Sequence, residues 1–393
     1  MSRDHAQIEA TGPDFHLAGG VLTVDLEALA DNWRTMARLS EPAEAAAAVK
    51  ADAYGLGAAE VVPALVDAGC RRFFVALPHE GAVVRRTAPA AEIYVLSGPL
   101  SGETGGYFRA HRLTPVLNSI QDAALWEAEG WDGNQQLPAA LHVDTGMNRL
   151  GMSLAEARQF ASDNALTRAV QVSLVMSHLA CADEPSHPLN RMQAKAFQEA
   201  RALFPGIEAS LANSAGILLG GDFLAGLTRP GIALYGGAPS SVSPSPVRPV
   251  VTAQARVLQV RHVRKGESVG YGATVHVTRD SIVAIVAAGY ADGLHRAASG
   301  SGVPLRRSVP QGGAGFIGGR RVPLLGRISM DLTAFDVTDL GADEVAPGDM
   351  IELFGPNIPI DEAARAAGTI AYELLTSLGR RYHRVYVRGE AHG

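Results

Sequence analysis

The first 240 residues alternate between two hydrophobic patterns. Short continuous apolar runs are typical of strands buried on both faces, and apolar residues recurring every three or four positions are typical of helices. We expect strands at residues 45–49, 72–77, 93–96, 114–117, 139–143, 171–177, 207–211 and 231–235. Helical patterns separate them at residues 57–68, 78–86, 119–129, 153–163, 188–203 and 213–219. One further helix is expected after Asp25, a capping residue that follows the apolar run 21–24.

Eight apolar strands separated by helices predict a parallel sheet covered on both faces. Eight such units in roughly 200 residues fit a closed (β/α)8 barrel better than an open sheet, so the fold class is α/β with a TIM-like barrel. In that fold the chemistry lies at the carboxyl ends of the strands. Lys50, the run 144–149, His178, Asn213 and Ser214 all follow a predicted strand, so the sequence predicts one shared site.

The composition changes at residues 238–249, where proline and serine dominate and a linker is expected. Beyond it the helical patterns nearly vanish. Strands are expected at residues 250–260, 281–288, 322–325, 332–337 and 350–354, with helices at 360–366 and 371–378. The expected domains are therefore an N-terminal arm at 1–20, a barrel at 21–240 and a mostly β domain at 241–393. Most of the arm, the first ~18 residues, is expected to be loosely held.

Composition and charge exclude several classes of function. The net charge of −6 comes without a basic patch, which argues against nucleic acid as a partner. No apolar stretch reaches the roughly 18 residues of a membrane span, and the N-terminus lacks the apolar segment of a signal peptide. Cys70 and Cys181 are too few for a disulfide framework and lack the spacing of a metal site. We therefore expect a cytoplasmic protein with no metal and no membrane contact.

Lys50 ends the first barrel strand and precedes a tyrosine and two glycines. A lysine buried at such a position loses its proton more easily and can form a Schiff base, although an isolated lysine usually reaches solvent instead. The run Val-Lys-Ala-Asp-Ala-Tyr-Gly-Leu-Gly at residues 49–57 resembles the cofactor-lysine motif of alanine racemases. Further matches follow in family order at residues 141–151, 176–180, 212–216, 229–236, 269–274, 287–293, 326–331 and 369–375.

This resemblance, from about residue 21 to 386, implies a fold-type III pyridoxal 5'-phosphate enzyme that racemises alanine. Lys50 would hold the cofactor, and Arg149 would contact its phenolic oxygen and the substrate. His178 would lie against the pyridine ring, and Arg229 would face the ring nitrogen. Because arginine only donates hydrogen bonds, it would keep that nitrogen unprotonated and favour simple reprotonation of the substrate. The remaining cofactor contacts implied by the family are Tyr54, Leu96, Asn213, Ser214, Gly231, Ile232 and Tyr372.

Racemisation requires proton exchange on both faces of one carbon, and the family supplies a second base from the neighbouring subunit. Here that base is Tyr271, which implies a homodimer with shared active sites and makes Lys50 and Tyr271 the catalytic residues. The resemblance adds Tyr290, the backbone N–H of Met330 and Asp331 to the substrate side. Tyrosine ordinarily has a pKa near ~10, so cationic surroundings from His178 and Arg149 are expected to lower it.

One position departs from the family. Many alanine racemases have a carbamylated lysine where this chain has His142, and that carbamate holds the arginine. Histidine forms no such stable carbamate, so another acceptor, such as a bound anion or a nearby carboxylate, is expected to orient Arg149.

Other functions stay open at this stage. The chain is expected to interconvert L-alanine and D-alanine, which supplies D-alanine for peptidoglycan or degrades it. A broad-specificity or serine racemase would share these motifs, and a non-catalytic pyridoxal phosphate barrel protein or a barrel decarboxylase would share part of them. Asp144-Thr145-Gly146 alone also suggests an aspartic protease, which needs a second carboxylate. The GxGxxG pattern at residues 313–318 lacks a following helix, so we interpret its glycines as turn residues.

Overall fold

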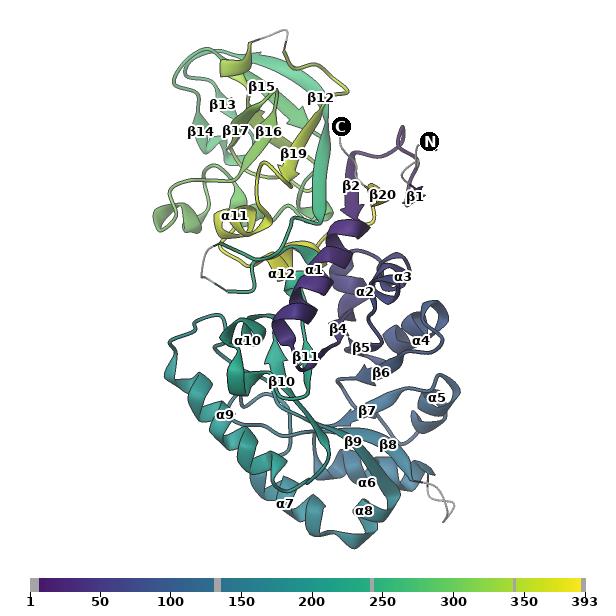
Figure 1. The fold of residues 1–393 in the computed structure, drawn as a ribbon. Coiled ribbons are helices and arrows are strands. Elements are labelled where there is room, and N and C mark those ends of the chain that lie inside the picture. The colour runs from purple at the N-terminus through teal and green to yellow at the C-terminus, as the bar shows by residue number, and fades with distance from the viewer. Residues whose placement is uncertain (1–6, 131–135, 241–243, 342–343, 390–393) are drawn as a thin grey trace. The chain divides into compact units, whose positions relative to one another are not determined.

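The computed structural model describes residues 7–130, 136–240, 244–341 and 344–389. The chain divides into two compact units (Figure 1). The barrel unit comprises residues 30–234 and 238–247, and the β unit comprises residues 1–29, 235–237 and 248–393. Residues 21–29, which precede the first barrel strand, thus belong to the β unit, and the chain passes between the units more than once.

The barrel unit is built on parallel strands that close on themselves. Its strands are β3 (Glu44–Ala45), β4 (Ala47–Ala48), β5 (Arg72–Val75), β6 (Glu92–Val95), β7 (Thr114–Leu117), β8 (Leu137–His142), β9 (Val170–Met176), β10 (Glu208–Asn213) and β11 (Leu227–Arg229). β3 pairs with β11 and β4 pairs with β5. Because the Ala46 N–H also donates to the Thr228 carbonyl at 2.9 Å, residues 44–48 act as one strand that closes the sheet. The predicted eight-stranded parallel barrel is confirmed for the described residues.

Side chains fill the inside of this barrel. Phe74 and Tyr94 stack with ring centroids 4.8 Å apart. The small Ala46, Ala48 and Ala140 share the same cluster and leave room for those rings. The barrel interior is therefore a packed core, and the functional surface is limited to its ends.

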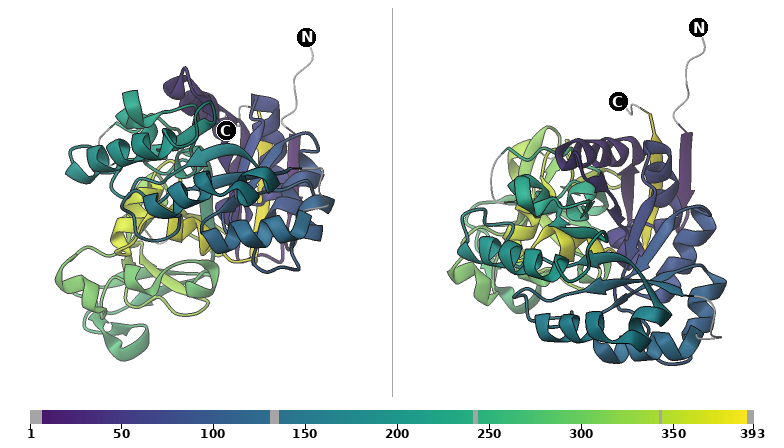
Figure 2. Two further views of the ribbon diagram at one scale, coloured as in Figure 1. Left: turned by 90° about the horizontal axis from the view of Figure 1, so that it is seen from below. Right: turned by 60° about the horizontal axis from the view of Figure 1, so that its bottom comes forward.

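Helices cover the outside of the strands in the barrel unit (Figure 2). They are α3 (Ala58–Ala68), α4 (Pro78–Thr87), α5 (Gly105–Ala110), α6 (Ile120–Gly130), α7 (Leu154–Ser162), α8 (Asn164–Ala169), α9 (Pro188–Arg201) and α10 (Ser214–Leu219). The preceding helix α1 (Leu26–Ser40) begins where the sequence predicts, since the Ala28 N–H donates to the Asp25 carboxylate at 2.8 Å. All six predicted barrel helices are confirmed, each to within about two residues at either end.

The prediction for the last barrel strand is wrong. Residues 231–235 form the 3₁₀ helix η2 (Ile232–Tyr235), and the strand is the preceding β11. Pro230 has no N–H for a ladder, and the N–H groups of Gly231 and Ala233 donate to the Ser214 hydroxyl at 2.8 and 3.4 Å. Residues 232–235 are buried. A buried strand and a buried 3₁₀ helix can both have a continuous apolar run, so the sequence pattern could not distinguish them.

The β unit contains a second closed sheet, which confirms the β-rich C-terminal domain. Its ring runs through β12 (Val251–Val263), β15 (Ser281–Val286), β18 (Thr333–Asp336), β17 (Arg320–Leu325), β16 (Ala314–Ile317) and β19 (Met350–Phe354), and β19 pairs again with β12. Gly318 and Gly319, with φ of 58° and 74°, make the two-residue turn between β16 and β17. The hairpin predicted for this stretch is confirmed, but only Gly318 of the GxGxxG glycines lies in its turn, since Gly315 lies within β16.

Three strands extend this sheet beyond β12: β2 (Gly20–Asp25), β20 (Tyr382–Arg388) and β1 (Gln7–Thr11). The expectation of a loosely held arm is wrong for residues 7–11, because β1 pairs antiparallel with β20 along its whole length. The reason is that β20 would otherwise leave an unpaired edge, whose N–H and C=O groups need partners.

Short elements complete the β unit. They are β13 (Ser268–Val269), β14 (Val275–His276), the 3₁₀ turns η3 (Tyr271–Ala273) and η4 (Tyr290–Asp292), and the helices α11 (Ile360–Ala366) and α12 (Ala371–Thr376). Within the described ranges, no helix combines the length and the apolar character that crossing a bilayer requires.

Candidate active site

The residues after Lys50 form a left-handed turn where the sequence predicts only a loop. Within α2 (Lys50–Gly55), residues 51–54 all have φ between 52° and 56°. Left-handed geometry costs roughly 1–2 kcal/mol for each non-glycine residue, so this turn needs external support. One support is the Asp52 carboxylate, which accepts the Ala58 N–H at 2.8 Å. Strain maintained in this way is typical of a functional site.

Lys50 lies in an environment that favours its neutral amine. Partial burial lowers the pKa of Lys50, the positive charge of Arg149 lowers it further, and the Glu80 carboxylate opposes both. Because the neutral amine is the nucleophile, a lowered pKa increases the reactive fraction of Lys50 at any given pH.

Arg229, at the end of β11, is a buried cation without a carboxylate partner in the described part of the chain. It is 6% exposed, and it donates to the Ser210 hydroxyl and to the Ser177 carbonyl, the latter at 2.5 Å. Burial lowers the pKa of Arg229 to about 9, so the guanidinium stays charged at neutral pH. Its Nε–H makes no hydrogen bond to the described residues and is available to a ligand.

His178 follows β9 and lies beside this arginine. The Arg229 Nη2 is 3.5 Å from His178 Nδ1, and because a guanidinium can only donate, that nitrogen is the acceptor. Burial, followed by the positive charge of Arg229, holds the pKa of His178 well below its ordinary value. The expectation that His178 contributes a positive charge is therefore wrong: it is neutral at pH 7.

His142, at the end of β8, is also neutral. Its Nδ1 lies 2.8 Å from the Asn118 side-chain oxygen. That oxygen faces His142 because the Asn118 amide nitrogen donates to the Leu96 and Val116 carbonyls, at 3.0 and 2.9 Å. Nδ1 therefore carries the hydrogen, and Nε2 is left as an acceptor. Burial, followed by the charge of Arg229, lowers the pKa of His142 to about 4.

The depressed pKa of His142 predicts a pH-dependent contribution to stability. Between pH 6.5 and about 4 the unfolded chain protonates this side chain while the folded chain does not, so wild-type stability falls as the pH falls. His142→Gln keeps a polar partner for Asn118 and removes this titration. Chemical unfolding of the cofactor-free protein should show the variant gaining about 3 kcal/mol relative to wild type across that window. A difference that stays constant with pH would contradict the assigned state of His142.

The start of α10 and the turn after β11 form a polar cradle. The Asn213 side-chain oxygen caps α10 by accepting the Gly216 N–H at 2.8 Å. The Ser214 hydroxyl accepts the N–H groups of Gly231 and Ala233, as described above, and so keeps its own hydrogen for another acceptor. Gly231 lies so close to the Tyr54 hydroxyl that a Cβ atom would meet it at 2.4 Å. This cradle suits the oxygens of an anion.

Gly231→Ala is expected to displace the Tyr54 side chain from this cradle, because its methyl group would occupy the place of the hydroxyl. Loss of one hydrogen bond to a charged ligand corresponds to roughly 10- to 100-fold weaker binding of the cofactor. A dissociation constant from cofactor titration measures this. Tyr54→Phe alone should weaken binding to a similar extent, and the double variant Gly231→Ala, Tyr54→Phe should weaken it little further, since both changes remove the same hydroxyl from the cradle. Unchanged affinity in Gly231→Ala would show that Tyr54 plays no part in binding.

Two further predicted residues lie at this end of the barrel. Arg149 is exposed in the loop after β8, where it forms no ion pair with any described residue. That loop is shaped by the Asp144 carboxylate, which accepts the N–H groups of Gly146, Met147 and Asn148 at 2.9–3.0 Å. Leu96 follows β6 and packs against the interior cluster. The structure thus brings all the predicted barrel residues to the carboxyl ends of the strands.

The predicted residues of the β unit form a separate group. Tyr271 is 71% exposed and opens η3 between two glycines of positive φ. Tyr290 in η4 contacts the loop that carries Met330 and Asp331, because its N–H donates to the Ser329 carbonyl at 3.0 Å. The Met330 N–H donates to no other group in the described part of the chain, as a substrate-binding amide requires. Tyr372, on α12, is about two-fifths exposed.

Sequence reasoning missed three residues that support this site. Asn118 follows β7, so the strand-end rule that found His178 could also have found it. Arg381 donates to the carboxylates of Asp292 and Asp331, at 2.7 and 2.8 Å, and so ties η4 to the Met330 loop. Glu80 occupies an ordinary helix-capping position, and no pattern in the sequence distinguishes it from a cap.

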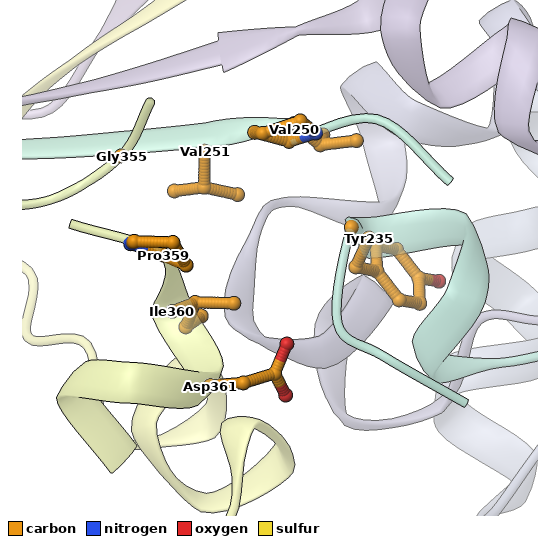
Figure 3. Close-up of a pocket in the computed structure, with 9 residues that line it drawn as sticks. Tyr235, Val250, Val251, Gly355, Pro359, Ile360 and Asp361 are labelled. Carbon is orange, nitrogen blue, oxygen red and sulfur yellow. The ribbon is translucent and has the colours of Figure 1, made fainter. Parts of the chain in front are cut away.

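The β unit contains two cavities, and the larger one is lined in part by Asp331. Figure 3 shows the smaller, about 40 Å³, where Ile360 and Asp361 of α11 face Tyr235 and the start of β12. It has room for little more than a water molecule or two. The larger, about 530 Å³, is lined by Leu17, Leu258 and Leu332 and by the Asp331–Arg381 ion pair. Neither is lined by a predicted residue of the barrel. No group of His, Cys, Asp and Glu in the described ranges could hold a metal ion.

Comparison with known proteins gives matches over nearly the whole chain. The model of the alanine racemase N-terminal domain matches residues 24–239, and that of the C-terminal domain matches residues 250–386. A protein named alanine racemase from Rhizobium meliloti is 53% identical over 377 residues, covering 96% of this chain and 99% of the relative. A biosynthetic alanine racemase from Agrobacterium fabrum is 51% identical, covering 93% of each chain.

A solved structure agrees with these matches. The crystal structure of alanine racemase from Bartonella henselae with covalently bound pyridoxal phosphate has a TM-score of 0.86 and 37% identity. The alignment covers 94% of this chain and 99% of that one.

Proposed function

This chain belongs to the alanine racemase family, and we propose that it interconverts L-alanine and D-alanine with pyridoxal 5'-phosphate, using Lys50 and the Tyr271 of a second subunit as its two bases. The observation that carries this proposal is the lysine with a lowered pKa at the same barrel end as a buried, carboxylate-free arginine. The reaction runs in both directions, so one site serves either the supply or the removal of D-alanine.

The residues at the barrel end fit pyridoxal phosphate. Lys50 offers an amine with a lowered pKa for the covalent attachment, and the Arg229 Nε–H is a free donor for the ring nitrogen. The Ser214 hydroxyl and the Ile232 backbone, next to Tyr54, fit a phosphate group, with Asn213 shaping the cradle. The Gly231 N–H donates to Ser214, so Gly231 contributes by holding that hydroxyl in place and by leaving room for Tyr54. Leu96 and Tyr372 complete the proposed contacts.

When bound, the cofactor withdraws electrons from the substrate carbon and so acidifies its α-hydrogen. The protein directs the subsequent proton transfers. Arg229 would place its positive charge beside the ring nitrogen and, because a guanidinium only donates hydrogen bonds, would disfavour a proton on that nitrogen. A ring with an unprotonated nitrogen would withdraw electrons less strongly than a protonated one. Return of the proton to the same carbon would then be favoured over other reactions. Arg149, Met330 and Asp331 are proposed to hold the substrate, with Tyr290 beside them.

Two bases on opposite sides of the α-carbon allow the proton to leave one face and return to the other. We assign the face that yields D-alanine to Lys50 and the face of L-alanine to Tyr271. His178 accepts from Arg229 at Nδ1, so its Nε2 carries the hydrogen and can donate to the Tyr271 oxygen.

We propose that the working form is a homodimer. Tyr271 is 71% exposed, whereas a catalytic proton carrier works in a site from which bulk water is excluded, so a second copy is needed to cover it. The proposal also locates the enzyme in the cytoplasm, where the free Cys70 and Cys181 stay reduced.

Circular dichroism with a panel of small L- and D-amino acids tests the function. The optical signal of either alanine enantiomer should decay to that of the racemate in the presence of the purified protein and added cofactor. A signal that decays faster with serine would favour a broad-specificity or serine racemase. A signal that never decays, for any amino acid, would reject the racemase and leave a non-catalytic barrel protein.

A further inference from the structure

One carboxylate supports both a helix and the turn after Lys50. Glu80 lies in the first turn of α4, and its Oε2 accepts the N–H groups of Ala76 and Leu77, at 2.7 and 3.0 Å. Its Oε1 accepts the N–H of Ala51 at 2.8 Å. The side chain thus connects the end of β5 with the residue that follows Lys50, 29 positions away in the sequence.

A capping role explains the two contacts of Oε2 but not the contact of Oε1 with Ala51. Glu156, in the same position of α7, receives the N–H and the hydroxyl of Ser153 on one oxygen, both at 2.8 Å. Its other oxygen has no such distant partner among the residues that the structure describes. A single oxygen is therefore enough to cap a helix, and the second oxygen of Glu80 performs a task outside α4.

That task concerns the orientation of Lys50. Ala51 is the first of the four left-handed residues, so its N–H belongs to the peptide plane that sets the direction of the Lys50 backbone. Because left-handed geometry is unfavourable without glycine, the turn persists only where its ends are held. Asp52 holds the far end through Ala58, and Glu80 holds the near end.

The charged groups around Lys50 also indicate a role for Glu80. The cation that lowers its pKa is Arg149, from the loop after β8, and the carboxylate that raises it is Glu80. His178, from the end of β9, also faces Lys50 and is neutral at pH 7. The positive charge of Arg229, from β11, adds to burial in lowering the pKa of His178. The carboxylate of Asp52 is engaged with the Ala58 N–H.

We propose that Glu80 is a positioning residue for Lys50, holding the left-handed turn that directs the amine and supplying the negative charge that balances Arg149. The consequence for catalysis rests on the proposed racemase function, whereas the effect on the amine does not.

The first test is Glu80→Gln, which keeps one oxygen acceptor and removes the charge, with Glu156→Gln as the matched control. The chain has only three lysines, Lys50, Lys195 and Lys265, so ¹³C NMR of the reductively methylated, cofactor-free full chain resolves each amine. The Lys50 signal, assigned by its loss in Lys50→Ala, should titrate at a lower pH in Glu80→Gln than in wild type. Glu156→Gln should leave it unchanged. A Lys50 titration that is the same in wild type and Glu80→Gln would overturn the proposal.

The second test uses the holoenzyme. Glu80→Gln is expected to lower kcat roughly 10- to 100-fold with little change in KM, since the amine is misdirected. The limb of the pH–rate profile that belongs to Lys50 should move to lower pH. Glu80→Asp keeps the charge but is too short to span both contacts, so it should lower kcat while the Lys50 titration stays near that of wild type. Full kcat in both variants would also overturn the proposal. If the wild-type protein racemises nothing, the NMR result still decides the role of Glu80.

Discussion

Lys50→Ala protein is expected to purify without the visible absorbance of bound pyridoxal phosphate and to lose alanine racemisation completely. The variant removes both the point of covalent attachment and one of the two bases, so neither the colour nor the turnover has another source. Absorbance spectra and circular dichroism assays on one preparation measure both losses.

A second lysine provides the control for this experiment. Lys195→Ala, on α9, should keep wild-type colour and turnover, since that side chain is exposed to solvent. Bound, coloured cofactor with substantial turnover in Lys50→Ala would show that a different residue holds the cofactor.

Tyr271→Phe protein is expected to retain the cofactor absorbance but to lose turnover by roughly 10²- to 10⁴-fold, the usual contribution of a general acid or base. The substitution removes only the hydroxyl of a side chain that is 71% exposed, so the fold should be unaffected. Loss of turnover without loss of colour would separate proton transfer from cofactor binding.

Tyr107→Phe is the matched control, because it removes a hydroxyl from another exposed tyrosine, on α5 of the barrel unit. It should keep full activity. If Tyr271→Phe is as active as Tyr107→Phe, the two-base assignment fails.

The hydrophobic pattern predicted the barrel well because a strand buried on both faces leaves a continuous apolar run. It failed at residues 231–235, where the run is equally apolar but the N–H groups bond to Ser214. It also missed β1 and β20, whose pairing joins the two ends of the described chain. Whether two such distant segments pair depends on the tertiary fold, which local periodicity does not record.

The candidate site divides in the same way. Lys50 and His178 follow apolar strands, and the parallel fold brings such strand ends together, so position alone indicated them. Their protonation states were harder to foresee. The neutral state of His178 follows from its burial beside Arg229, and the roles of Asn118 and Glu80 follow from hydrogen bonds across the barrel. The four left-handed residues after Lys50 include no glycine, so nothing in the sequence announced them.

The central claim is that each active site takes its two bases from two different chains. Mixing the inactive Lys50→Ala and Tyr271→Phe proteins, under conditions in which subunits exchange, tests it directly. In a mixed dimer one site regains Lys50 from one chain and Tyr271 from the other, so random exchange should restore about one quarter of wild-type activity. If mixed dimers form and no activity returns, both bases belong to a single chain and the account is wrong.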